Sequence, residues 1–219
     1  MNRLILLFAL TIATCHLGAQ SFKRFMDRLN AMPLESRQAV ADSFMSTLTT
    51  LPYIEGDTTV HFLYSGEVGS VAMAGDATNW RPSARLQKIE GTDLWHLTCH
   101  YKADARLDYQ FVIDGNNWIN DAGNPARCAG GYGENSELRM PGSAIPPETL
   151  SHPEIPGGSL IDSLWYSKTM QNQRKIIIYL PAEYQQTIHR YPVIFFHDGN
   201  DYLTFANAHK ILDYLIHNQ

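Results

Sequence analysis

The chain has 219 residues, a net charge of −5 and an apolar fraction of 44%. This is the composition of an ordinary globular protein, with enough apolar material for one or two cores. The slightly acidic balance, and the lack of a long run of Lys or Arg, argue against a nucleic-acid-binding role.

The first twenty residues have the three-part pattern of a secretory signal peptide. A short basic start is followed by an apolar run from Leu4 to Ala13 and then by Leu17-Gly18-Ala19. The run is too short to span a membrane. We therefore expect a signal peptide over residues 1–19, cleaved after Ala19, and a secreted or periplasmic protein. The alternative is a lipoprotein signal that acylates Cys15, which Thr14 disfavours.

Residues 20–50 are expected to form a helical lead segment. Apolar residues recur at helical spacing in two stretches, and Pro33 suits the first turn of the second helix. The apolar stripes are Phe22, Phe25, Met26 and Leu29, then Val40, Ala41, Phe44, Met45 and Leu48. Neither helix carries a chemical motif, so packing against a neighbouring domain is the expected role.

The period changes to two over residues 51–140. Strands are predicted at residues 59–64, 71–74, 94–101 and 106–113, with a turn at 114–117 and a short return strand at 118–120. Short strands at this spacing are typical of a β-sandwich. Cys99 shares the inward face of its strand with Trp95, Leu97 and Tyr101. A buried free thiol is therefore favoured over a disulfide with Cys128, although export permits one.

Residues 141–158 are rich in Pro and Gly and are predicted to be a linker. Beyond it, residues 159–165 and 174–180 are expected to be strands. The continuous apolar run at residues 191–196 is typical of a strand that is covered on both faces, as in an α/β sheet. A helix is predicted next, with Phe205, Ala208, Ile211, Leu212, Leu215 and Ile216 on one side.

Two resemblances follow from these segments. The stretches Val71 to Trp80, Gly91 to Trp95, Tyr109 to Gly115 and Asn120 to Pro125 resemble, in order, the landmarks of the early-set, immunoglobulin-like modules of glycogen-branching enzymes. Residues 163–219, with Arg174 to Pro181, Arg190 to Val193 and His197 to Tyr202, resemble the start of enterochelin-esterase-like domains, a family that includes feruloyl and acetyl-xylan esterases. The fold expected is an immunoglobulin-like β-sandwich followed by the incomplete N-terminal part (residues 159–219) of an α/β-hydrolase domain.

The resemblance implies acyl transfer by a Ser-Asp/Glu-His triad, with the serine in a G-x-S-x-G elbow. It also implies that the loop Asp198 to Asp201 supplies a backbone N–H to the oxyanion hole, with Gly199 or Asn200 as the donor. The alternative is a tight turn that merely requires Gly199.

The nucleophile, however, is missing. No G-x-S-x-G occurs in the chain, and neither serine nor cysteine follows Ser167. His209 and His217 therefore have no nucleophile to serve. We expect the front part of a secreted ester hydrolase that is inactive as given, and a hydrolase part that does not fold well alone.

Two other roles remain open for the β-sandwich. Trp118, Asn117 and Trp80 are the candidates for stacking on carbohydrate. Alternatively, the sandwich shapes the substrate mouth of the esterase and binds nothing alone. No cofactor is expected, and no histidine or cysteine set has the spacing of a metal site. A calcium loop of Asp114, Asn116 and Asp121 is conceivable, but a turn explains these residues more simply.

Overall fold

The computed structural model describes residues 21–186, 188 and 190–219. The predicted signal peptide, its cleavage site after Ala19 and the alternative acylation site at Cys15 lie outside these residues. Within the described part of the chain, no helix combines the length and the apolarity that a membrane crossing requires.

The helical lead segment forms two helices, as predicted. Helix α1 spans Phe22–Asn30 and α2 spans Arg37–Met45, with a 3-10 turn at Leu34–Ser36 between them. Ser21 caps α1, because its hydroxyl accepts the backbone N–H of Arg24 at 3.3 Å. Pro33 precedes the 3-10 turn, one turn ahead of the helix that it was expected to open.

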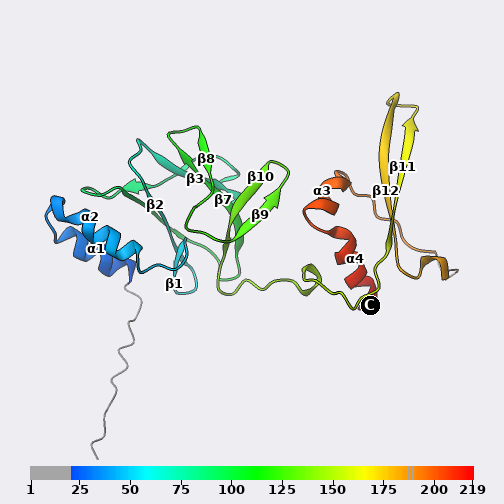
Figure 1. Cartoon of the computed structure of the whole chain (residues 1–219), viewed down its shortest axis with the longest axis horizontal. Coiled ribbons are helices and arrows are strands. Elements are labelled where there is room, and N and C mark those ends of the chain that lie inside the picture. Colours follow the sequence, from blue (N-terminus) through cyan, green and yellow to red (C-terminus); the bar gives the residue numbers. More distant parts are fainter. Residues whose placement is uncertain (1–20, 187, 189) are drawn as a thin grey trace, which may run out of the picture.

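The residues that follow form two antiparallel sheets (Figure 1). The four-stranded sheet has the order β1-β2-β6-β5, and the larger sheet has the order β4-β3-β7-β10-β9, with β8 paired to β7. The strand bounds are β1 Tyr53–Glu55, β2 Thr59–Ser65, β3 Val71–Gly75, β4 Ala84–Arg85, β5 Gln87–Lys88, β6 Leu94–His100, β7 Arg106–Ile113, β8 Asn117–Ile119, β9 Arg127–Gly130 and β10 Gly133–Arg139.

The two sheets pack face to face around one core. Phe62 of β2 and Trp95 of β6 meet Met73 of β3 and Phe111 of β7 in a single apolar cluster. The predicted alternation is confirmed, since Cys99 lies half-buried against this cluster with Leu97 and Tyr101. Cys99 and Cys128 are both free thiols. The sandwich architecture is therefore observed, while its immunoglobulin-type topology and the domain boundaries stay predictions.

Helices α1 and α2 cover the outer face of the four-stranded sheet. Phe25, Leu29 and Phe44 form a second core with Leu63 of β2 and Leu94 of β6. Strand β2 is consequently buried on both faces: Val60 and Phe62 point into the sandwich, whereas His61 and Leu63 point toward the helices. The helical segment thus packs on the sandwich itself.

The C-terminal segment starts with little regular structure. Only a 3-10 turn at Pro147–Thr149 interrupts the predicted linker. Strands β11 (Ser159–Ser167) and β12 (Asn172–Leu180) then pair as an antiparallel hairpin that makes a separate two-stranded sheet. The predicted single helix is two helices, α3 (Gly199–Thr204) and α4 (Ala208–His217), because the chain breaks between Phe205 and Asn207.

The strand predicted at residues 191–196 is absent. No regular structure occurs at these positions, and the exposed fractions of Val193, Ile194 and Phe195 are 74%, 66% and 87%. A strand buried on both faces needs a hydrogen-bonded neighbour and covering elements. No described segment pairs with residues 191–196, so the prediction was wrong for this structure.

Candidate functional site

The loop predicted to form an oxyanion hole lies at the start of α3. Asp198 is in the left-handed region with φ of 53°, and the N–H of Asp201 donates to its carbonyl at 2.9 Å. Gly199 does not have a positive φ, and a Cβ placed on it would meet nothing within 4 Å. The turn therefore does not require glycine at that position. Asn200 is exposed and Gly199 half-buried.

Two of the histidines considered above lie on α4, the helix that follows α3. His217 is exposed and His209 is half-buried on α4. On the same helix, Asp213 is buried and accepts hydrogen bonds from the N–H of Gly158 at 2.7 Å and the hydroxyl of Tyr179 at 2.8 Å. Asp213 thus ties α4 to the β11–β12 hairpin. It acts as a structural anchor.

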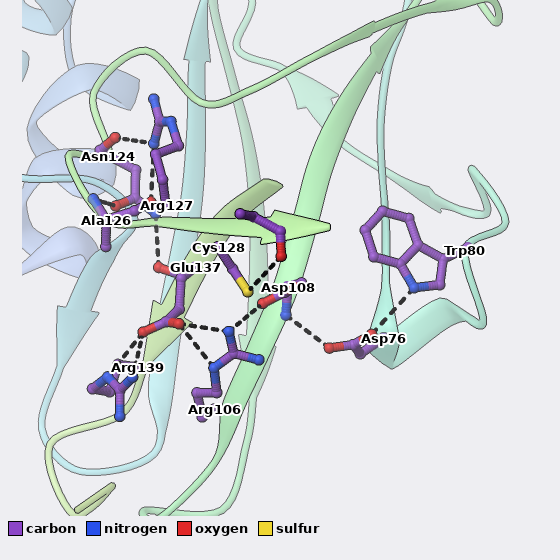
Figure 2. Close-up of polar contacts among 11 residues, drawn as sticks. Asp76, Trp80, Arg106, Asp108, Asn124, Ala126, Arg127, Cys128, Glu137 and Arg139 are labelled. Atoms are coloured by element: carbon purple, nitrogen blue, oxygen red, sulfur yellow. Dashed lines mark hydrogen bonds and ion pairs between the residues drawn. The ribbon is translucent and has the colours of Figure 1, made fainter. Parts of the chain in front are cut away.

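Two tryptophans of the six-stranded sheet and its loops are exposed. The register places Trp118 of β8 opposite Val112 of β7. The exposed fractions of Trp118 and Trp80 are 43% and 38%. Trp80 is held by Asp76, whose Oδ1 accepts the indole N–H at 3.2 Å while its Oδ2 accepts the backbone N–H of Asp108 at 2.8 Å (Figure 2). Of the predicted sugar contacts, Asn117 is also exposed.

Beside Trp80, Figure 2 shows a compact group of charged side chains. One ligand atom from each of Asp108, Cys128 and Glu137 lies within 4.8 Å of the others. Arg106 pairs with Asp108 at 2.9 Å and with Glu137 at 2.6 Å, and Arg139 pairs with the other oxygen of Glu137 at 2.6 Å. Burial raises the pKa of the Cys128 thiol. A metal would have to displace both arginines and deprotonate the thiol, so the group fits an ion-pair network better than a metal site.

The residues considered for a calcium loop have separate structural roles. Asp114 accepts the backbone N–H groups of Gly69 and Ser70 at 2.9 and 2.8 Å. Asp121 is buried and accepts the hydroxyl of Tyr109 at 2.7 Å, and burial raises the pKa of both groups. The two carboxylates therefore hold turns and the core in place.

One acid–imidazole–hydroxyl arrangement was not anticipated from the sequence. His61 Nε2 lies 3.2 Å from Glu55 Oε2, and its Nδ1 lies 2.9 Å from the hydroxyl of Thr98. The ring of Phe22 stacks on the imidazole of His61 with centroids 4.2 Å apart. Because α1 covers the imidazole, a substrate cannot reach it, and the arrangement is not a hydrolytic triad. A pattern of apolar alternation could not indicate it, since alternation puts His61 on the face opposite Val60 and Phe62 without showing what covers that face.

Comparison with known proteins finds a similarity to esterases in the C-terminal part of the chain. Residues 167–219 match a family model described as "Putative esterase". No curated protein is similar enough to the chain to count as a relative.

The fold is similar to that of solved enterobactin esterases. The enterobactin esterase of Shigella flexneri, solved with enterobactin, matches with a TM-score of 0.55 and 22% identity, over 81% of this chain and 54% of its own. The ferric enterobactin esterase of Salmonella typhimurium matches with a TM-score of 0.59 and 19% identity, over 81% of this chain and 55% of its own. The chain thus spans about half the length of these structures. The match of residues 167–219 and the similar fold support the predicted relationship to esterases.

Proposed function

We propose that this chain is the leading part of a secreted carboxylic-ester hydrolase of the enterochelin or feruloyl esterase type. The sequence match of residues 167–219 to esterases carries the proposal. The solved structures of similar fold are enterobactin esterases, so the substrate class is an acyl ester of a siderophore or of a plant polysaccharide.

In this proposal the 219 residues do not hydrolyse esters by themselves. Acyl transfer on this scaffold needs a hydroxyl or thiol that is activated by a base, and neither serine nor cysteine follows Ser167. The purified full chain is expected to release p-nitrophenol from p-nitrophenyl acetate no faster than buffer does. Saturable turnover that survives chromatography together with the chain would contradict the proposal.

The sandwich then serves to shape the substrate mouth. The turn between β9 and β10 lies close to α3, since a Cβ placed on Gly131 would be 3.5 Å from Oδ2 of Asp201. Tyr132, in the same turn, is fully exposed. An aromatic side chain beside the Gly199–Asn200 loop suits contact with an aromatic acyl group. In an active full-length relative, deleting the corresponding hairpin should change the preference among esters.

A second candidate function is carbohydrate binding by the exposed tryptophans of the sandwich. The exposure of Trp118 and Trp80 favours it, because an accessible indole face can stack on a sugar ring. Titrating the full chain with malto- and xylo-oligosaccharides should change the tryptophan fluorescence. Trp118→Ala should then weaken binding about tenfold, or about 1.4 kcal/mol, whereas the core variant Trp95→Phe should bind normally. Unchanged tryptophan fluorescence at millimolar sugar would contradict carbohydrate binding.

A further inference from the structure

Two histidines lie under helix α1 on the outer face of the four-stranded sheet. His61 of β2 is buried, and His96 of β6 is half-buried. Both rings contact Phe22, the first residue of α1, with centroid distances of 4.2 Å to His61 and 5.4 Å to His96. The apolar docking surface of α1 thus rests on two titratable rings.

The surroundings of the pair favour neutral imidazoles. The Nδ1 atom of His96 is buried without a hydrogen-bond partner among the described residues. Burial lowers the pKa of His96, and His61 lowers it further. For His61, burial lowers the pKa more than Glu55 raises it. Protonation of either ring is therefore unfavourable while Phe22 covers it.

The charged and titratable groups around His61 and His96 do not reverse the lowering of the two pKa values. Strand β1 contributes Glu55, which bonds to His61, and Tyr53, whose pKa burial raises; β6 contributes His100, which disfavours a charge on His61. The charged residues of α1 are all exposed: Lys23, Arg24, Asp27 and Arg28. Lys23 and Asp27 form an ion pair with each other. On α2, Arg37 bonds to backbone carbonyls and Asp42 to Gln38. One carboxylate therefore faces two imidazoles.

We propose that the pair His61 and His96 is an acid-sensitive latch that holds α1 on the sandwich at neutral pH and releases it on mild acidification. The direction of the pH effect follows from the coupling between protonation of the histidines and docking of α1. Both histidines have a lowered pKa when α1 is docked and the ordinary value near 6.5 when it is released. The released state then binds more protons, so docking weakens as the pH falls below about 6.5.

Hydrogen exchange on the full chain tests the latch. Protection factors of the α1 amides, residues 22–30, should fall about tenfold between pH 7.5 and 5.5, because protonation favours the released state. Those of β7 should stay constant and serve as the internal reference. His96→Phe should reduce the pH dependence to the part that His61 contributes. The control His217→Phe, at an exposed position on α4, should keep all of it.

Equal α1 protection at the two pH values, or an unchanged loss in His96→Phe, would overturn the latch. If His96→Phe does not fold, the imidazole carbon signals of the unmodified chain decide the question by NMR titration. Both His61 and His96 should titrate below 6.5, with exchange of α1 following them. A midpoint at or above 6.5 for either residue would refute the proposal.

Discussion

At the scale of single residues, four buried polar side chains of the sandwich form one hydrogen-bond network: Tyr109, Asp121, Asn124 and Ser136. Tyr109 donates to Asp121 and accepts from the side chain of Asn124 at 3.2 Å, and Ser136 accepts the backbone N–H of Asp121 at 2.8 Å. These four residues are all buried. Removing one partner leaves the others without hydrogen bonds in an apolar setting, which costs more than the bond itself contributes.

Tyr109→Phe tests this network. The change removes only the hydroxyl, so Asp121 and Asn124 each lose a partner, and the free energy of unfolding should fall by about 1–3 kcal/mol. Urea unfolding monitored by fluorescence measures the loss. Tyr132→Phe, at a fully exposed position, is the matched control and should change nothing. A fall below about 0.5 kcal/mol in Tyr109→Phe would mean that solvent replaces the bonds.

At the scale of elements, sequence periodicity predicted some parts of the fold and missed others for identifiable reasons. Strands β2, β3, β6 and β7 were predicted almost to their ends. Strand β10 was missed because one of its inward positions is Ser136, a polar residue that hydrogen bonds in the core and so hides the alternation. Residues 191–196 were predicted as a strand because they form a continuous apolar run. The prediction failed because such a run does not show whether another strand lies beside it to pair with.

The candidate site was predictable only in part. The sequence singled out Trp118, Asn117 and Trp80, and all three are exposed. It could not show that Arg106 and Arg139 neutralise Glu137, nor that α1 covers His61, because both depend on contacts between distant elements. Residues far apart in sequence become partners only through the packing of the sheets.

Helix α1 depends on its aromatic contact with α2. Phe25 is fully buried and stacks on Phe44 with centroids 4.1 Å apart. Phe25→Ala should therefore lower the free energy of unfolding by about 3–5 kcal/mol, the usual cost of such a cavity. Lys23→Ala, which removes an exposed ion pair on the same helix, should cost at most about 0.5 kcal/mol. Similar losses in the two variants, measured by urea unfolding, would show that α1 is not packed in this way.

At the scale of the whole molecule, the sandwich buries its apolar side chains, whereas the C-terminal part leaves many of its own exposed. The sandwich has one core between its sheets and another under the helices, whereas the hairpin β11–β12 and residues 191–196 leave many apolar side chains exposed. Figure 1 shows this hairpin standing apart from the other strands. An open apolar surface of this kind favours association.

Replacing Val193, Ile194 and Phe195 together by serine should therefore reduce self-association. The purified triple variant should scatter less light and bind less of the dye ANS than the unmodified chain at equal concentration. A matched set of three changes at exposed polar positions, Gln171, Gln173 and Lys175 to serine, should leave both signals unchanged. Equal ANS binding by the triple variant and the unmodified chain would mean that these apolar residues are covered in solution.

We propose above all that this chain is the front part of an ester hydrolase and contains no activated nucleophile. Fluorophosphonate labelling of the full chain, followed by intact mass spectrometry, tests it most directly, because the probe reacts covalently with the activated serine of this class of enzyme. We predict no adduct under conditions that label an enterobactin esterase completely. One probe molecule bound per chain, lost again after denaturation before labelling, would contradict the claim.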